Sequence, residues 1–320
     1  MVDTQPAAGE AERPWTPSVG GPQPLTLPAT GFALLLAALW GGNAVAIKAG
    51  LDDAPPLRLA WMRFVAGGIV TIAWAVSTKQ SLRPTRPELR PLAGLAALFT
   101  AQIAFMNIGQ DHTTASHAVV INTTFPLWTG VIAHFFVRGD RLTRGRTIGT
   151  LVAYAGVVAV FGQSLGTSDG TALGDVLMLC SAALLGARQV YTSLVSQTVS
   201  LPKLLITQTI FGIAVFLGMG LLVENEPWAI TERLVMSIFY QGVVIAGFGF
   251  IGNMWLLKHY LPSGVTALSL TTPVWGVILS HFILDEPLGP TLFLGLALVI
   301  LGSAMAQWSA IRRRPARVPR

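Results

Sequence analysis

Ten apolar runs, separated by short polar segments, make up most of this chain. A helix needs about 20 apolar residues to cross the roughly 30 Å hydrocarbon core of a bilayer, and each run approaches that length. Several runs lack the polar face that a helix of a soluble bundle exposes, and proline or glycine often marks their ends. We therefore predict an all-α integral membrane protein with ten transmembrane helices, at residues 32–50, 57–77, 92–110, 115–137, 146–164, 173–194, 203–223, 234–256, 262–284 and 289–309.

One stretch of the sequence occurs twice. Four residues of uncommon type recur at one constant spacing, and these are His112, Pro126, Trp128 and His134 in the first copy and His259, Pro273, Trp275 and His281 in the second. The spacing is far longer than the unit of a solenoid, so it indicates a duplicated half-protein. We predict a first repeat at residues 31–164 and a second at residues 172–309, with five helices in each.

Charged residues predict how the helices are oriented in the membrane. Acidic residues gather in every second gap between helices, whereas most lysines and arginines lie in the other gaps and in the two tails. Because cytoplasmic loops are enriched in lysine and arginine, both termini are predicted to be cytoplasmic, at the cell (inner) membrane. Five helices per repeat is an odd number, so the second repeat must be inverted relative to the first. Inverted-topology repeats with a site between them are typical of secondary transporters.

The composition agrees with a membrane protein and excludes other classes. Of 320 residues, 52% are hydrophobic and 11% are charged, whereas soluble domains carry about 25% charged residues. The net charge of +6 resides in segments such as a basic cytoplasmic tail at 310–320, which faces anionic lipid headgroups, so nucleic acid is not needed to explain it. The single cysteine, Cys180, excludes a disulfide framework. A polar, proline-rich segment at 1–28 is predicted to be a disordered cytoplasmic tail.

Several short motifs follow one another in a fixed order. They are Trp40-Gly41-Gly42-Asn43 with Lys48, Leu59-Ala60-Trp61-Met62-Arg63-Phe64, Gly149 with Gly156, and Pro273 with Glu286-Pro287-Leu288, Gly295 and Gly302. Together they resemble the EamA-like family of the drug/metabolite transporter superfamily, over residues 31–162 and 173–306. The resemblance implies ten helices, cytoplasmic termini and the export or exchange of small metabolites such as amino acids, purines or drugs. The chain departs from the family pattern at His112 and at Arg138-Gly139-Asp140, so the substrate class is not inherited.

Two prolines mark a layer where the repeats can meet. Pro126 and Pro273 lie about 11 residues into their helices, close to the bilayer midplane, and mirror-related positions share a depth only there. Each proline removes a backbone hydrogen bond and is predicted to kink its helix. The neighbouring side chains that we expect to line a cavity are Asn122, Thr124, Trp128, Thr271, Thr272 and Trp275. The alternative is that the threonine hydroxyls bond within their own helices and the kinks only shape packing.

Three basic residues lie inside predicted spans, where each costs about 2.5–3.5 kcal/mol on insertion scales. Lys48 is a candidate for coupling or ion pairing, and the alternative is that its side chain, near the outer end of the helix, extends to the interface. Arg63 is expected either to contact the substrate or to pair with an outer carboxylate such as Asp111 or Asp52. Arg188 is a candidate for binding an anion or carboxylate, and the alternative is that its side chain extends to the cytoplasmic interface.

Uncharged polar residues within the spans complete the candidate cavity, and these are Asn43, Asn107, Tyr191, Gln241 and Asn253. Some are expected to join helices instead. No carboxylate lies deep in a predicted span, so proton coupling would depend on histidines, among which we single out His112 for coupling or ion pairing. Because most histidines lie near helix ends, a structural role is the alternative. The sequence leaves proton coupling, facilitation and exchange open.

These features predict an inner-membrane permease that exports or exchanges a small metabolite, such as an amino acid or a related compound. Transport is expected by alternating access through a central cavity between the repeats. The expected partners are the substrate and the lipid bilayer, without a cofactor, a metal or nucleic acid, and both a monomer and a homodimer stay open. Drug efflux and a non-transporting sensor or scaffold are the alternatives. An enzyme is not predicted, because no cluster of histidines or carboxylates shares one depth.

Overall fold

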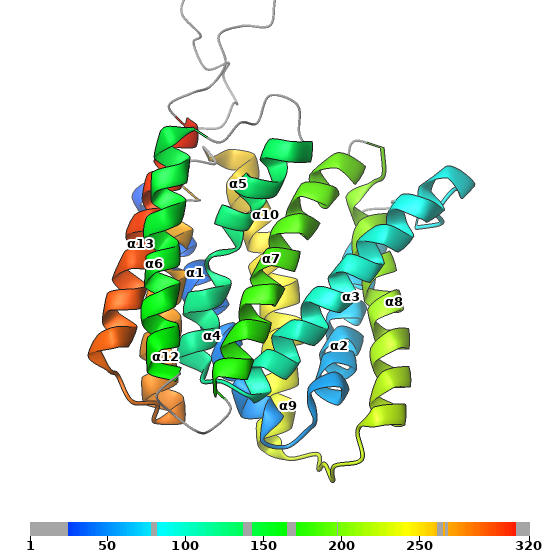
Figure 1. Ribbon diagram of the computed structural model, residues 1–320. Helices are drawn as coiled ribbons and strands as arrows, with labels where there is room; N and C mark the ends of the chain where they lie inside the picture. Colours follow the sequence, from blue (N-terminus) through cyan, green and yellow to red (C-terminus); the bar gives the residue numbers. More distant parts are fainter. Residues whose placement is uncertain are drawn as a thin grey trace, which may run out of the picture.

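The computed structural model describes residues 25–77, 82–136, 143–164, 171–196, 198–260, 265 and 268–311. These form a bundle of long helices that run roughly side by side (Figure 1). Most of both predicted tails and the segment Arg138-Gly139-Asp140 lie outside the described residues. The first helix begins at Leu27, inside the segment predicted as a disordered tail, because Thr26 caps it and Pro28 fits its first turn.

The first repeat contains five spans. Its elements are α1 (Leu27–Leu51), α2 (Pro56–Ser77), η1 (Arg86–Glu88), α3 (Leu89–Asp111), α4 (Ala115–Asn122), α5 (Phe125–Phe136) and α6 (Arg144–Ser164). The short η1 leads directly into α3. α4 and α5 together form the fourth span, which is interrupted at Thr123 and Thr124.

The second repeat follows the same order. Its elements are α7 (Thr171–Val195), α8 (Leu201–Val223), α9 (Glu232–Phe239), η2 (Tyr240–Gly249), α10 (Phe250–His259), α12 (Thr272–Leu284) and α13 (Pro290–Ile311). α9, η2 and α10 form one span, in which η2 is a π-helix. Seven described spans are long and apolar enough to cross a membrane, and shorter apolar helices supply the fifth, ninth and tenth. The predicted ten transmembrane helices are therefore confirmed.

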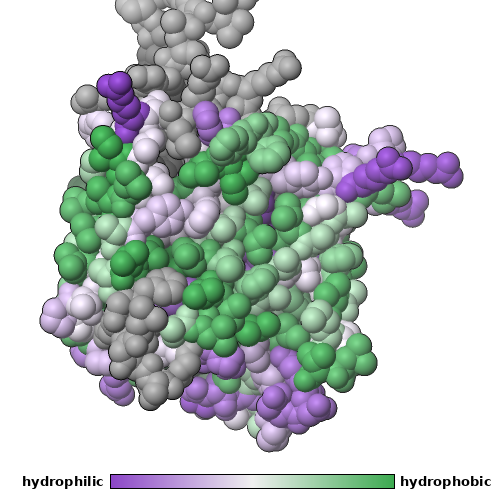
Figure 2. All heavy atoms as spheres, viewed as in Figure 1, coloured by the Kyte–Doolittle hydropathy of each residue, from purple (hydrophilic) through white to green (hydrophobic). Residues whose placement is uncertain are grey.

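Successive spans run in opposite directions, so the start of α1 and the end of α13 lie at the same end of the bundle (Figure 1). We call the opposite end the distal end. Because each repeat holds five spans, the second repeat is inverted relative to the first. Figure 2 shows apolar side chains covering the middle of the visible face, with hydrophilic ones gathered towards its ends. Large apolar side chains such as Leu222 and Phe282 are 81% and 76% exposed, which suits contact with lipid.

Glycines of the two repeats pack against one another where α6 meets α13. A Cβ atom on Gly156 would lie 2.6 Å from the Gly295 carbonyl oxygen, and one on Gly302 would meet the Gly149 carbonyl oxygen even more closely. Gly149 matches Gly295 in the repeat, and Gly156 matches Gly302, so the contact is the same when read from either half. We call these four residues the glycine seam. It brings two backbones together as small residues do in membrane helix pairs.

A second pair of glycines joins the first helix of each repeat to a proline-containing helix of the other repeat. We call α5, with Pro126, and α12, with Pro273, the proline helices. A Cβ atom on Gly41 of α1 would lie 2.7 Å from backbone atoms of α12, at Thr272 and Gly276. One on Gly186 of α7 would lie 2.6 Å from the Trp128 Cβ atom of α5. These contacts are again equivalent in the two repeats. The proline helices therefore lie at the interface between the repeats.

Candidate functional site

The proline-containing spans are broken rather than bent. α4 ends at Asn122 and α5 begins at Phe125, so Pro126 lies in the first turn of a new helix. α12 begins at Thr272, with Pro273 in its first turn. A proline suits that turn because an N–H group there would have no helical partner. The structure thus has helix starts at both prolines, where kinks were predicted, and the starts match in the two repeats.

Threonine hydroxyls at these breaks bond within their own chain segments. Thr123 and Thr124 each donate to a carbonyl oxygen about one turn earlier, at 2.7 Å. Thr271 does the same at 2.7 Å. This is the alternative that the sequence left open, and Thr124 is fully buried. Thr272 is half-buried and follows the second break.

Two buried polar atoms beside the first break have no hydrogen-bond partner among the described residues. The Asn122 Oδ1 atom and the Trp128 Nε1–H group are buried without a hydrogen bond to any described residue. The Trp128 ring meets the Tyr154 ring edge-on, with 5.4 Å between centroids. Such atoms are uncommon in the middle of a span, where lipid offers no hydrogen bonds. Trp275 takes the matching place beside the second break, half-buried against Gly41.

Arg63 lies inside α2 with 6% of its surface exposed. Its Nη1 group donates to Oε1 of Gln241 at 2.9 Å, and Gln241 in turn donates to Ser237 at 2.8 Å. The predicted pairing of Arg63 with Asp111 or Asp52 is therefore wrong, because the arginine meets a neutral amide of η2. The Arg63 Nε–H group is buried and has no partner among the described residues.

Arg188 lies in α7, half-buried against α3. Its guanidinium carbon lies 5.0 Å from the centroid of the Phe99 ring. Within the described part of the chain, it makes no hydrogen bond or ion pair with another residue. Tyr191, one turn along α7, packs against Gly94 of α3. Both side chains therefore face α3 and not the proline helix α5.

The remaining cavity candidates are spread over the bundle. Asn107 is fully buried and donates to the Pro56 carbonyl oxygen at 2.9 Å, so it joins α3 to the start of α2. Asn43 in α1 and Asn253 in α10 are half-buried. The structure thus brings Asn122, Thr124 and Trp128 together at one break, and Arg63 together with Gln241. Asn107 instead joins α3 to the start of α2.

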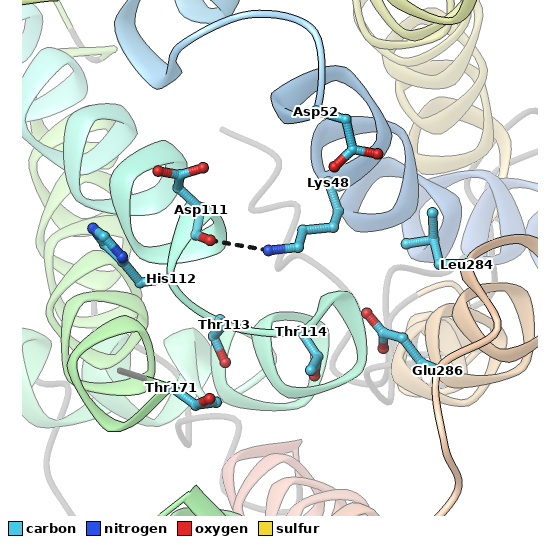
Figure 3. A pocket seen from close by; sticks show the side chains of 9 residues that line it. All are labelled: Lys48, Asp52, Asp111, His112, Thr113, Thr114, Thr171, Leu284 and Glu286. Atoms are coloured by element: carbon cyan, nitrogen blue, oxygen red, sulfur yellow. Dashed lines mark hydrogen bonds between the residues drawn. The ribbon is translucent and has the colours of Figure 1, made fainter. Parts of the chain in front are cut away.

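A pocket of about 440 Å³ opens at the distal end (Figure 3). Its lining consists of Lys48, Asp52, Asp111, His112, Thr113, Thr114, Thr171, Leu284 and Glu286. The Lys48 ammonium group points toward the end of α3 and donates to the carbonyl oxygens of Gln110 and Asp111, at 2.9 and 3.0 Å. A cation is favoured at a helix C-terminus. Lys48 therefore ties α1 to α3, and His112 lies in the pocket wall.

Two glutamates cap helix starts at the distal end. Glu286 accepts hydrogen bonds from the backbone N–H groups of Ala115 and Ser116, at 2.6 and 2.9 Å, in the first turn of α4. Glu224 accepts from two N–H groups in the first turn of α2, at 2.6 and 3.0 Å. From the sequence, Glu224 was only one of the acidic loop residues, and Glu286 was a loop charge within a family motif. Each glutamate is far in sequence from the helix that it caps, so no local motif could reveal the contact.

A buried acid–base pair joins α4 to α7 nearby. The Nδ1 atom of His117 lies 3.0 Å from Oδ2 of Asp175, and Thr113 donates to the other carboxylate oxygen at 2.5 Å. Asp175 is fully buried. Sequence reasoning singled out His112 instead. The signal that could have found the pair is topology, because α4 and α7 both begin at the distal end.

An exposed cluster closes the distal rim. Arg233 donates to Asp52 at 2.8 Å and to Asp53 at 2.7 Å. Hydrogen bonds from Arg233 and Thr231 lower the pKa of Asp53 to about 2. The pKa of Asp53 is thus lower in the folded protein than in the unfolded chain. At pH values above the ordinary pKa, the ionised carboxylate therefore stabilises the fold, and this stabilisation is lost as the pH falls through 2. Asp53 therefore stays ionised at neutral pH.

Known proteins share this organisation. The sequence profile of the EamA-like transporter family matches residues 27–162 and again residues 172–307. The "uncharacterized transporter YoaV" of Bacillus subtilis is 23% identical over 279 residues, which cover 86% of this chain and 95% of the relative. A "probable amino-acid metabolite efflux pump" of Escherichia coli is 29% identical over 286 residues, covering 85% and 92%. A solved crystal structure has the same fold, with a TM-score of 0.63 at 19% identity, covering 91% of this chain and 99% of that one.

The two profile matches coincide with the two halves that the fold separates. A further relative, the "uncharacterized inner membrane transporter YedA" of Escherichia coli, is 25% identical over 279 residues, covering 86% of this chain and 89% of the relative. Proteins of this family are transporters and not enzymes. This chain is therefore a multi-pass membrane protein that belongs to the EamA-like transporter family of the drug/metabolite transporter superfamily, with one family unit in each inverted repeat.

Proposed function

We propose that this protein exports a small metabolite, such as an amino acid or a related compound, across the cell membrane by alternating access. The observation that supports this proposal is the pair of helix breaks at matching positions in the two inverted repeats. We call residues 122–128 and 271–275 the break layer. Helix breaks near the midplane, between inverted repeats, are where secondary transporters bind their substrates. The name of the Escherichia coli efflux pump agrees with a metabolite of this class.

The break layer offers groups that a polar substrate could use. The Asn122 Oδ1 atom is a free acceptor and the Trp128 Nε1–H group is a free donor, both within the described structure. Thr272 and Trp275 form the corresponding wall on α12, beside Gly41. When the repeats move apart at this layer, these atoms gain a substrate or water as their partner. A hydrogen bond left unmade in a buried site is costly, so the open layer favours a ligand that completes it.

The direction of transport follows from the two ends of the bundle. The excess of lysine and arginine in the C-terminal tail and in the loops at the same end of the bundle favours a cytoplasmic location for both termini. The distal pocket then opens on the opposite side of the membrane. At this end, Glu286 and the His117–Asp175 pair fasten α4 to α12 and α7. Export would require these distal contacts to open after the substrate has entered the break layer from the cytoplasm.

Metabolite profiling of the growth medium tests transport directly. Cells that overexpress the protein should release at least one small metabolite faster than cells that lack it. Trp275→Ala and Thr272→Val should lower that release at least fivefold, because each changes the wall of the break layer. Leu222→Ala, on the lipid-facing surface of α8, is the matched control and should leave release unchanged.

Two results would count against the proposal. A medium that is the same with and without the protein would favour a sensor or scaffold over a transporter. Full release by both break-layer variants, at equal amounts of membrane-inserted protein, would remove this layer from the transport path.

A further inference from the structure

The start of α4 is held by two buried carboxylates that belong to the second repeat. One is Glu286, which follows α12 and caps α4. The other is Asp175 of α7, which accepts a hydrogen bond from the Thr113 hydroxyl at 2.5 Å and lies 3.0 Å from the His117 Nδ1 atom. Asp175 and His117 are 0% and 5% exposed. The two repeats are therefore joined at the distal end by buried groups that can gain or lose a proton.

Backbone packing holds Asp175 in this place. A Cβ atom on the preceding residue, Gly174, would lie 2.5 Å from the His112 carbonyl carbon and 2.7 Å from the Gly109 carbonyl oxygen. The start of α7 therefore lies directly against the end of α3, and this contact fixes Asp175 in the interior. A buried carboxylate is costly unless hydrogen bonds and a positive charge compensate it. His117 can provide that positive charge.

The pair lies directly behind the wall of the distal pocket. Thr113, which donates to Asp175, and Thr114 both belong to that wall (Figure 3). The Thr114 hydroxyl oxygen accepts from the His117 backbone N–H group at 3.1 Å, which fixes the histidine at the start of α4. The pocket therefore brings the solution on the distal side of the membrane to within one side chain of Asp175.

The charge of the imidazole determines how strongly α4 and α7 hold together. Histidine ordinarily changes its charge between about pH 5 and 8. With both ring nitrogens protonated, the contact between His117 and Asp175 is an ion pair, and a charge-assisted hydrogen bond is about twice as strong as a neutral one. With a neutral imidazole, the carboxylate keeps a hydrogen bond but its charge is no longer compensated. Loss of one proton thus weakens the contact between the repeats.

We propose that the His117–Asp175 pair is a proton-controlled latch of the distal end. A proton taken up from the distal side holds α4 against α7 and keeps this end closed, and loss of that proton lets the end open. The step moves one proton between water and a ring nitrogen of His117 and breaks no other covalent bond. The inference rests on the proposed function, because export requires the distal end to open. It makes the acidity of the solution outside the cell a regulator of release.

Other titratable groups at the distal end must be told apart from the latch. α1, α3 and α12, or the residues directly after them, bring such groups to this end, and these are Lys48, Asp52, Asp111, His112, His281 and Glu286. The described residues of α6 and α13 add no charged side chain there. His112 is the most informative of the six, because it is an exposed histidine of the pocket wall, close in sequence to His117 but outside the pair.

The accessibility of a cysteine in the purified protein measures opening without any substrate. In a Cys180→Ala background, Ala115→Cys places a thiol in the first turn of α4, at a position that is 1% exposed. This thiol reacts with a maleimide only while α4 is lifted away. Glu226→Cys, at an exposed position of the distal loop, measures the reactivity of a free thiol at the same pH. The ratio of the first rate to the second should rise at least fivefold from about pH 5.5 to about pH 8, as the latch loses its proton.

Three variants identify the group that responds to pH. His117→Gln keeps a polar side chain that cannot be charged, and Asp175→Asn removes the charge that attracts the imidazolium. Both should make the ratio of rates independent of pH. His112→Gln is the matched control and should keep the full rise.

A ratio that stays constant or falls with rising pH while the native pair is present would overturn the latch. A rise that persists in His117→Gln, or one that disappears in His112→Gln, would assign the response to other groups and overturn it as well. If His117→Gln does not fold, Asp175→Asn and the protein with the native pair still decide. Metabolite release separates this proposal from the proposed function. A responsive ratio in a protein that releases nothing leaves the latch without the exporter, and release with a constant ratio leaves the exporter without the latch.

Discussion

Glu286 reaches from the end of α12 to the first turn of α4 and accepts hydrogen bonds from two backbone N–H groups there. The first N–H groups of any helix lack carbonyl partners within the helix, and in a membrane protein they cannot all rely on water. The same carboxylate also accepts from the Ser116 hydroxyl at 2.6 Å. One side chain thus fixes the position of a half-helix that belongs to the other repeat.

Replacing Glu286 by glutamine should destabilise the protein by about 1.5–3 kcal/mol, because hydrogen bonds to a charged acceptor are lost and an NH₂ group faces N–H donors. A lower melting temperature in detergent would report this loss. Asp285→Asn is the matched control, since it removes a neighbouring exposed charge at a left-handed position that asparagine also accepts. Equal melting temperatures for the two variants would show that the cap does not stabilise the fold.

Partners of the buried polar residues were the least predictable part of the site. Arg63 was expected either to contact the substrate or to pair with a distal carboxylate, and in the structure it meets Gln241 of η2. The spans are apolar on nearly all sides, so their sequences do not show which face turns toward which neighbour. Arg188 was recognisable as an isolated charge in a span, but Phe99 as its partner followed only from the rotation of α3 and α7.

Among the helices, the two proline spans differ most from expectation. A proline within a hydropathic run predicts a kink, because the sequence does not show whether the helix continues behind it. In α4 and α5, Thr123 and Thr124 end one helix and Pro126 lies in the first turn of the next. The position of the irregularity was thus predictable from Pro126, while its form depended on local hydrogen bonds of the threonines.

At the scale of helix pairs, the glycine seam leads to a direct test. Gly156→Leu should lower stability by about 1–3 kcal/mol or more, because its Cβ atom would lie 2.6 Å from a backbone oxygen that cannot move aside. Gly218→Leu in α8 is the matched control, since nothing lies within 4 Å of its Cβ position. Size-exclusion profiles and melting temperatures of both variants measure the difference. A Gly156 variant as stable as the Gly218 variant would contradict the close packing at the seam.

The architecture of the whole molecule could be predicted from sequence because two independent signals, the hydropathy of the spans and the internal repeat, agree. Hydropathy set the number of spans, and their number per repeat made the second half inverted. The matched glycines Gly149, Gly156, Gly295 and Gly302, recognisable from sequence, lie together in the structure. Such long-range agreement arises because a bilayer forces every span to cross it completely, which leaves few arrangements to choose from.

Orientation of the molecule in the membrane is testable by cysteine labelling. In a Cys180→Ala background, Glu226→Cys in the distal loop should react with a membrane-impermeant maleimide added to intact cells. Arg144→Cys, at the opposite end of the bundle, should react only after the cells are opened. Both positions are exposed in the structure. The reverse labelling pattern would place the termini outside the cell and invert the proposed direction of transport.

The glycine seam also bears on how the chain matures. α6 packs mainly against α13, which follows it by more than 120 residues in the chain. While the ribosome is still producing the second repeat, the face of α6 that carries Gly149 and Gly156 has no helix to pack against and must border lipid or the insertion machinery. A chain that stops before α13 leaves this face of α6 without its helical partner. The face of α6 that carries these glycines is therefore covered only once α13 has been synthesised.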